Sequence, residues 1–419
     1  MESEQNHQQA AIICPHCSLP LYLVIPRPHH RLQCPRCAQT LYKYRRNSLE
    51  KTLAFSLTGL LLFIPAVSLP LLTLGVFGLS STSSLAETVA SLFAQQDYLI
   101  GTVVLCTAII APFTILIMLF LVSLGIIRNW PATPLTTLFR WYHHVNEWAM
   151  TDVFLIGIFI TIIKMAHSSD IEFNTGFFCF IGLVLMTLAA QSTTAPYLFW
   201  QLLEKNSGST NTQWPLKEHE TTPPILCHCC HKIIPATAAT HSHCPRCRAS
   251  LHPRKQNSVA RTWALLITAI ILTIPANLLP IMQVEFFGMP DRSTILDGII
   301  YFFHEGSYGI GFIIFTASIL VPLFKIAGLI IVLLSIQLRW KSWLRHKTTM
   351  MRFIQFIGRW SMLDIFVISL LCALVQFGFL STIEIAPAAV YFTGVVICTM
   401  MAATTFDIRL IWDTTGSPS

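Results

Sequence analysis

Charged residues are scarce in this chain of 419 residues: Asp, Glu, Lys and Arg make up 11% of it, against roughly 25% in an ordinary soluble domain. Hydrophobic residues make up 53%, and the mean hydropathy is +0.61. A water-soluble core of this size cannot hide so many apolar side chains. The shortage of charge therefore excludes a soluble protein and favours an integral membrane protein.

Several sequence motifs of enzymes are also absent. The chain contains no G-x-x-x-x-G-K-[ST] loop for nucleotide phosphates, no G-x-S-x-G nucleophile elbow and no H-E-x-x-H helix. We therefore expect no enzymatic activity and no nucleotide ligand. The polar first ten residues are not followed by the short apolar stretch and cleavage site that are typical of a signal peptide.

What the chain does contain is one order of motifs that occurs twice. The two copies keep an offset of 210 residues through most of their length and of 212 residues near their end. A register held over so many residues indicates a duplication. The matched pairs include Ile64-Pro65-Ala66 with Ile274-Pro275-Ala276, Pro70 with Pro280, Pro112 with Pro322, Asp152 with Asp364, and Trp200 with Trp412.

Each copy has four apolar segments near the length of about 20 residues that a bilayer requires. We expect spans at 52–72, 99–127, 148–166, 173–199, 260–282, 309–337, 361–381 and 386–410. The predicted fold is an all-α integral membrane protein of two tandem repeats, each a small cysteine-rich ribbon followed by a four-helix transmembrane bundle. The predicted domains are ribbon 11–46, bundle 47–204, linker 205–223, ribbon 224–256 and bundle 257–412.

The distribution of basic residues predicts the topology. Of the 27 Lys and Arg residues, 24 lie in the ribbons, in the segments next to them, in the 128–147 and 338–360 loops, or at Arg409. The positive-inside rule places these segments, both ribbons and both termini in the cytoplasm, with the two copies in the same orientation. Because the basic and Trp-rich runs adjoin spans, we expect them to contact anionic lipid headgroups, and no nucleic acid.

The loops at 73–98 and 283–308 are the longest on the opposite, periplasmic side. Both begin with β-branched and aromatic residues around a Phe-Gly pair, which could form a small hairpin. We expect these loops to be the docking surface for a periplasmic partner, although a passive lid is the alternative.

Two Cys-x-x-Cys pairs precede each bundle. The spacing is C-x2-C-x16-C-x2-C in the first copy and C-x2-C-x13-C-x2-C in the second. In a cytoplasmic setting this pattern favours a tetrahedral zinc site over disulfides, whereas an iron centre or a redox dithiol is the alternative. Cys229 is the spare thiol of its knuckle. We expect two structural zinc ions, with the ligands Cys14, Cys17, Cys34, Cys37, Cys227, Cys230, Cys244 and Cys247.

Polar residues within the apolar segments are the candidates for a transport site, because charge inside a bilayer usually marks a pathway. Lys325 lies near the middle of its segment, and its counterpart in the first copy is Ile115. A structural ion pair is the alternative role for Lys325. For Asp152 and Asp364 we favour first-turn carboxylates stabilised by the helix dipole. The expected partners of Lys325 are Asn277, Thr404, Thr405 and Asp407.

The duplicated Cys-x-x-Cys pairs ahead of four-span units, the stretch from Ile274 to Ile281 and Leu323-Phe324-Lys325 resemble the paraquat-inducible protein A family of bacterial inner-membrane proteins. The resemblance covers nearly the whole chain. It implies a partner with mammalian-cell-entry (MCE) domains, which forms a periplasmic tunnel, and movement of lipids between the membranes that supports envelope integrity. It also implies zinc at the eight cysteines.

The first copy has Val67 where the second has Asn277, which favours a single lipid pathway through the second copy. The proton-motive force is a candidate drive because the chain lacks a nucleotide site. Two other functions stay open at this stage. One is a membrane redox or metal-sensing protein that uses the cysteine pairs, and the other is a passive scaffold that anchors the MCE partner.

Overall fold

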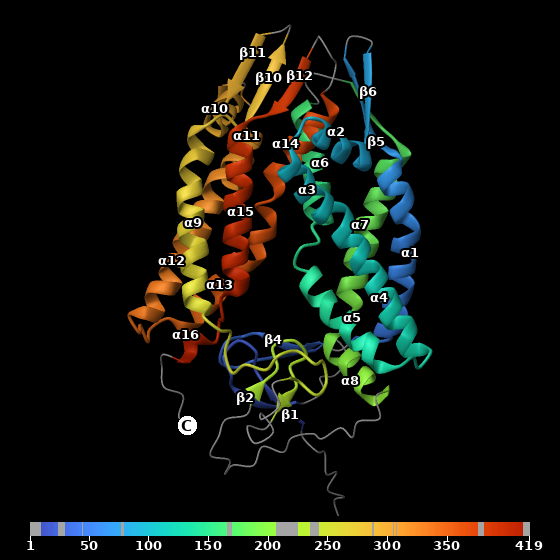
Figure 1. Ribbon diagram of the computed structural model, residues 1–419, viewed down its shortest axis with the longest axis vertical. Coiled ribbons are helices and arrows are strands. Elements are labelled where there is room, and N and C mark those ends of the chain that lie inside the picture. Colours follow the sequence, from blue (N-terminus) through green and yellow to red (C-terminus); the bar gives the residue numbers. More distant parts are fainter. Residues whose placement is uncertain are drawn as a thin grey trace, which may run out of the picture.

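The computed structural model has three layers, with sheets at one end, long helices in the middle and the cysteine-rich ribbons at the other end (Figure 1). The structure describes residues 10–413 except 24–29, 44, 77–78, 166–169, 207–224, 235–242, 287–288, 305, 307 and 376–380. The predicted linker at 205–223 therefore lies almost entirely outside the described residues.

The first repeat begins with two short hairpins and continues as a helical bundle. The hairpins are formed by β1 (Ala10–Ile13) with β2 (Pro20–Leu23), and by β3 (Arg31–Gln33) with β4 (Thr40–Lys43). The elements of the bundle are α1 (Ser48–Ser68), β5 (Pro70–Val76), β6 (Leu79–Ser84), α2 (Leu85–Ala94), α3 (Tyr98–Val104), the π-helix η1 (Leu105–Ile110), α4 (Ala111–Ile127), α5 (Ala132–Val145), α6 (Thr151–Met165), β7 (Asp170–Phe173), α7 (Thr175–Thr193) and α8 (Pro196–Asn206).

The second repeat has the same order of elements. Its ribbon contains β8 (Ile225–Leu226) and β9 (Ile233–Ile234). The elements of its bundle are α9 (Ser258–Leu278), β10 (Met282–Phe286), β11 (Met289–Ser293), α10 (Ile295–His304), α11 (Tyr308–Phe315), the π-helix η3 (Thr316–Leu320), α12 (Val321–Gln337), α13 (Leu344–Trp360), α14 (Leu363–Leu374), β12 (Ser381–Ile385), α15 (Pro387–Thr405) and α16 (Leu410–Asp413).

Seven helices of the described residues are long and apolar enough to cross a bilayer. Six of them coincide with predicted spans: α1, the α3–η1–α4 helix, α7, α9, the helix ending in α12, and α15. The seventh is the continuous segment Leu344–Leu374, formed by α13 and α14. The structure therefore confirms a membrane protein with many spans, but not the predicted number of eight.

The difference lies in the third segment of each repeat. The predicted span 148–166 contains α6 with 15 residues, and 361–381 contains α14 with 12 residues. At 1.5 Å per residue α6 is about 22 Å long, shorter than the hydrocarbon layer of about 30 Å, and α14 reaches a spanning length only together with α13. Helices α6 and α14 pack on each other at the seam between the repeats, where the rings of Phe154 and Phe366 lie 5.3 Å apart.

The prediction of an all-α fold was incomplete, because each bundle carries a three-stranded antiparallel sheet. The strand orders are β6-β5-β7 and β11-β10-β12. The third strand pairs with the hairpin from far along the chain, with Leu72 opposite Phe173 and Met282 opposite Ile385. The hairpins suggested for the two long loops are therefore present, although their Phe-Gly tips at 77–78 and 287–288 lie outside the described residues.

The duplicated proline pattern sets the boundary between helix and sheet. Helix α1 runs through Pro65 and ends at Ser68, where the backbone N–H of Leu69 donates to the Pro65 carbonyl at 3.0 Å. Helix α9 contains Pro275 in the same position. Because proline lacks an amide donor and restricts the residue before it, the second proline of each pattern stops the helix.

Candidate functional site

Four thiols of each ribbon converge on one point. Each cluster offers four sulfur atoms that all lie within 4.8 Å of one another, and all eight thiols are buried and free of disulfides. Sγ of Cys14 lies 3.5 Å from Sγ of Cys37, and Sγ of Cys227 lies 3.5 Å from Sγ of Cys247. These residues are the eight predicted ligands, so the sequence located both clusters.

The clusters fit a tetrahedral metal ion. Four sulfurs at about 2.3 Å from a zinc ion would lie about 3.8 Å apart along the edges of a tetrahedron, close to the observed separations of 3.5–3.6 Å. A disulfide would instead require about 2.05 Å. Cys229 is not a member of either cluster, as its spacing predicted.

The backbone of each knuckle closes in the same way. The residue after the second cysteine has a left-handed conformation and donates its N–H to the carbonyl of the first cysteine. The knuckles are thus preformed turns that orient two thiols toward one point. The left-handed residues are Ser18, Ala38, His231 and Arg248, with φ between 54° and 57°.

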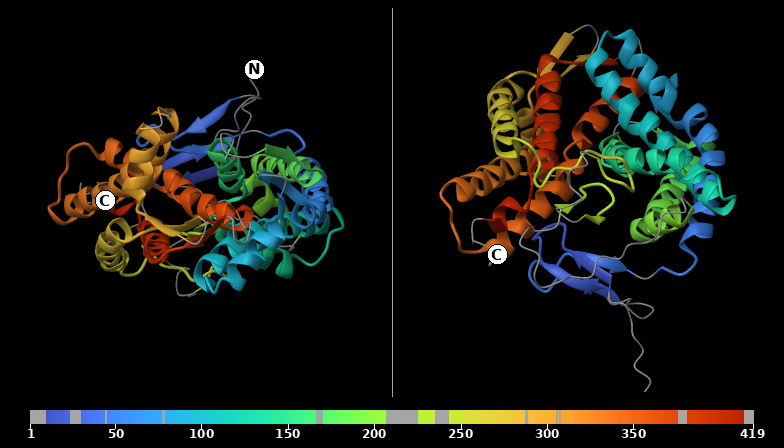
Figure 2. Two further views of the ribbon diagram at one scale, coloured as in Figure 1. Left: turned by 90° about the horizontal axis from the view of Figure 1, so that it is seen from above. Right: turned by 60° about the horizontal axis from the view of Figure 1, so that its bottom comes forward.

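The ribbons dock in a crossed arrangement. The cysteines of the first ribbon share a hydrophobic cluster with Met351 and Trp412 of the second repeat. The cysteines of the second ribbon share one with Phe139 and Trp200 of the first repeat. The right-hand view of Figure 2 shows the blue strands of the first ribbon beside the red C-terminal helix of the second repeat.

Arginines at equivalent positions of the two repeats make hydrogen bonds across both crossed contacts. Arg352 donates to the carbonyl of Cys37 at 3.1 Å, and its counterpart Arg140 donates to the carbonyl of Cys247 at 3.4 Å. The guanidinium of Arg36 lies over the Trp412 ring, 4.5 Å from its centroid. Arginine stacking and charge-assisted bonds to a knuckle carbonyl link each cysteine cluster to a bundle.

The second ribbon has ion pairs that have no counterpart among the described residues of the first. Glu204, at the end of the first bundle, accepts from Lys232 at 2.5 Å and also pairs with Arg246. Burial alone would raise the pKa of the Glu204 carboxyl, but hydrogen bonds and charge from these two cations lower it. The carboxylate therefore stays ionised and ties the second ribbon to helix α8.

A buried ion pair closes the ribbon end of the second bundle. Asp407 accepts from Arg409 at 2.8 Å and from the backbone N–H of Lys255 at 3.1 Å. Burial would raise the pKa of the Asp407 carboxyl, but Arg409 and the hydrogen bonds lower it to about 2. Arg409 also reaches the ring of His228 in the second ribbon, at 3.1 Å.

We expect Asp407→Asn to destabilise the protein by about 3–5 kcal/mol, because it leaves the buried Arg409 without its counter-charge. Asp413→Asn is the matched control. Asp413 pairs with Arg254 where the side chains are 44% and 34% exposed, so its loss should cost less than about 1 kcal/mol. Thermal melting of the detergent-solubilised variants measures the difference, and equal melting temperatures would contradict it.

Lys325 is fully enclosed within the second bundle, with 1% of its surface exposed. Its Nζ donates to Oγ1 of Thr399 on α15 at 2.9 Å, and Thr399 in turn donates to the Val396 carbonyl. The ion pairs found among the described residues all lie elsewhere. The first repeat has Ile115 and Thr187 at the equivalent positions, so the cation is unique to the second repeat.

The expected partners of Lys325 lie at other places. The carbonyl of Thr404 accepts from Lys255, and the carbonyl of Thr405 accepts from Ser258, both at the ribbon end of the bundle. Asn277 donates to the carbonyl of Thr273, one turn back on its own helix. Sequence reasoning missed Thr399, for which the only signal was a hydroxyl among the apolar residues of α15.

Asp152 and Asp364 occupy the first turns of α6 and α14, as expected. The carboxyl of Asp364 interacts with the Ser318 hydroxyl of η3, while its Oδ2 has no hydrogen-bond partner among the described residues. Ser318 precedes Lys325 by seven residues, so both lie on one face of the helix that contains η3 and α12. Sequence reasoning did not select Ser318.

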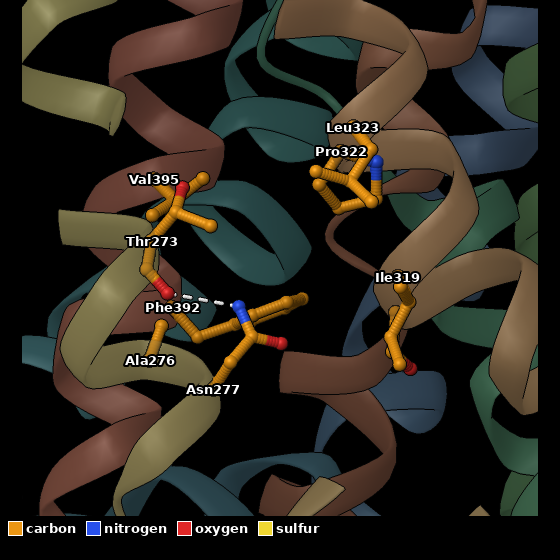
Figure 3. A pocket seen from close by; sticks show the side chains of 9 residues that line it. Thr273, Ala276, Asn277, Ile319, Pro322, Leu323, Phe392 and Val395 are labelled. Atoms are coloured by element: carbon orange, nitrogen blue, oxygen red, sulfur yellow. Dashed lines mark hydrogen bonds between the residues drawn. The ribbon is translucent and has the colours of Figure 1, made fainter. Parts of the chain in front are cut away.

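A cavity of about 120 Å³ lies on this same face. Ser318 and Pro322 border it from one side and Phe392 and Val395 of α15 from the other. Figure 3 shows the Phe392 ring reaching into the cavity from the same side as Asn277, opposite Ile319. The cavity thus lies one helical turn from the Lys325–Thr399 pair on both helices.

The fold and the clusters define a multi-pass membrane protein with two repeats, each with a four-cysteine ribbon. The paraquat-inducible protein A family matches residues 49–204 and 259–416. The chain belongs to this family.

Curated relatives match almost end to end. The chain is 32% identical over 416 residues to "Intermembrane transport protein PqiA" of Escherichia coli K12, which covers 98% of this chain and 97% of the relative. It is 31% identical over 400 residues to "Lipophilic envelope-spanning tunnel protein A" of the same strain, covering 96% and 90%. It is 30% identical to a "Probable intermembrane transport protein" of Haemophilus influenzae, covering 93% and 92%. No solved structure matches.

Proposed function

We propose that this protein is the inner-membrane component of an intermembrane lipid transport system. It would load or receive phospholipids for a periplasmic MCE-domain partner and so support envelope integrity. The names of its relatives, "Intermembrane transport protein PqiA" and "Lipophilic envelope-spanning tunnel protein A", support this class of function. The two sheets would meet the partner, because they lie at the end opposite the ribbons (Figure 1).

The proposed topology keeps both ribbons and both termini in the cytoplasm. Most basic residues lie in the ribbons or in the loops and segments near them, and both ribbons lie at the same end of the molecule (Figure 1). In this arrangement the short helices α6 and α14 form the third segment of each repeat and pack on each other, which gives four segments per repeat. Each ribbon holds one structural zinc ion, which would supply the folding free energy that so small a module lacks.

The observation that carries the proposal is the buried Lys325 beside a cavity in the second bundle. A cation without an ion-pair partner costs free energy inside the membrane, and such residues usually mark a transport pathway. Its ammonium has one hydroxyl partner, Thr399, and can lose or regain a proton without breaking an ion pair. Moving one charge through the membrane field yields about 2.3 kcal/mol per 100 mV. We propose that protonation of Lys325 couples the proton-motive force to lipid movement.

The test is lipid transfer by the purified protein in phospholipid vesicles, together with its periplasmic partner. Transfer of a fluorescent phospholipid should accelerate when a pH gradient is imposed and return to the basal rate when a protonophore dissipates it. Gradient-independent transfer would contradict the proton drive. No transfer under either condition, with the partner still bound, would instead support a passive scaffold.

A further inference from the structure

Phe392 separates two voids in the second bundle. One, which we call the outer cavity, lies between α9, η3 and α15 (Figure 3). The other is a void between α3, α14 and α15 that is too small to hold a water molecule, bordered by Ile100, Ile365 and Ile368. Phe392 lines both. Its ring, 3% exposed, is therefore a partition between a cavity within the second repeat and the seam between the repeats.

The outer cavity opens toward the surface that faces lipid. Leu323, which lines it, is 53% exposed, and Leu278, next to the lining residue Asn277, is 73% exposed. Exposed leucines on spanning helices lie against acyl chains, because lipid is their solvent. Apart from Thr273, Asn277 and Ser318, the lining side chains are apolar. The chemistry of the cavity therefore fits a hydrocarbon chain with a polar group near one end.

The cavity is too small for a lipid as it stands. An apolar cavity of about 150 Å³ binds benzene, so about 120 Å³ holds only the end of a chain. The opposite wall contains the π-helix η3, which supplies Ser318 and Ile319 and is followed by Pro322. A π-bulge next to a proline interrupts the helical hydrogen-bond ladder and is frequent at functional sites. The wall that contains η3 can therefore rearrange.

We propose that the outer cavity is an acyl-chain-binding site and that the Phe392 ring is its gate. When the ring rotates away, the two voids join into one path from the bilayer to α14 at the seam between the repeats. Lys325 follows Pro322 by three residues on α12 and Thr399 follows Val395 by four on α15, so the pair lies about one helical turn from the outer cavity. This inference rests on the proposed lipid transport, to which it adds the entry site and the gating residue.

The test uses the full-length protein in vesicles of phosphatidylethanolamine and phosphatidylglycerol that contain a phospholipid with a photoactivatable diazirine on one acyl chain. After irradiation, mass spectrometry maps the labelled peptides. The wild type should be labelled on α9, α12 and α15 around the outer cavity. In Phe392→Ala the labelling should extend to Ile365 and Ile368 on α14, with at least a tenfold rise in that peptide. In Phe392→Trp the α14 label should fall below the wild-type level.

Phe406→Ala is the matched control, because Phe406 directly follows the same helix, is 1% exposed and lines neither void. Its labelling pattern should equal that of the wild type. Labelling of α14 that is the same in the Ala and Trp variants would overturn the gate, and absence of label from the outer cavity in the wild type would overturn the binding site. Because labelling requires no transfer, either result is distinct from a failure of lipid transport itself.

Discussion

Replacing Lys325 with Met should reduce gradient-driven lipid transfer at least about tenfold and abolish envelope protection, because intramembrane charges mark transport pathways. The variant should accumulate at the wild-type level. Lys325 is 1% exposed, and exchanging a buried cation for an apolar residue of similar size is often neutral or stabilising. Transfer in vesicles, membrane abundance and detergent resistance of cells measure these effects.

Three further replacements separate coupling from folding. Lys347 is also a buried lysine of the second repeat, but it lies at the ribbon end and donates to the Trp340 carbonyl. Lys347→Met should keep lipid transfer. Thr399→Val removes the hydroxyl that holds Lys325, whereas Thr187→Val alters the equivalent site of the first repeat, where no cation lies. Only the Thr399 replacement should impair transfer, and wild-type detergent resistance of Lys325→Met would remove Lys325 from the mechanism.

Loss of a single ribbon thiol should have the largest structural effect. Cys37→Ser removes one of four ligands, and metal binding contributes about 10–16 kcal/mol to the folding of such modules. We expect the zinc content to fall from two ions to one per chain, and trypsin to cut within the first ribbon. Because Arg352 donates to the Cys37 carbonyl, the second bundle should also lose thermal stability.

Cys229→Ser is the matched control for this experiment. Cys229 lies in the same kind of knuckle but outside the tetrahedral cluster, so its replacement should leave two zinc ions, a trypsin-resistant ribbon and the wild-type melting temperature. Colourless protein that contains zinc would agree with the structural role, whereas a coloured, redox-active iron centre would favour the redox alternative. Zinc loss in Cys229→Ser equal to that in Cys37→Ser would contradict the proposed ligand set.

The features that the sequence predicted correctly depend on residues that lie close together in the chain. The eight cysteines were located because the spacing of a knuckle fixes which thiols can meet. Six spans were located because a stretch of about 20 consecutive apolar residues is typical of a membrane-spanning helix. The end of α1 and of α9 followed from the second proline of each pattern.

The features that were missed depend on contacts between distant segments. The predicted number of eight spans is not confirmed, because α6 has 15 residues and α14 continues from α13, and an apolar count does not show where a helix begins and ends. Strands β7 and β12 are four and five residues long and exist through pairing with hairpins about 100 residues earlier. Thr399 is 74 residues from Lys325. Periodicity and composition carry no information on such pairings.

The crossed docking of the ribbons sets an order of events during biosynthesis. The first ribbon leaves the ribosome long before the residues that receive it, among them Met351, Ile354 and Trp412. The early module must therefore wait, with part of its apolar surface uncovered, until α16 has been made. A chain truncated before Trp412 would keep this surface open to proteases, so the crossing makes seating of the N-terminal module a checkpoint for completion of the C-terminal half.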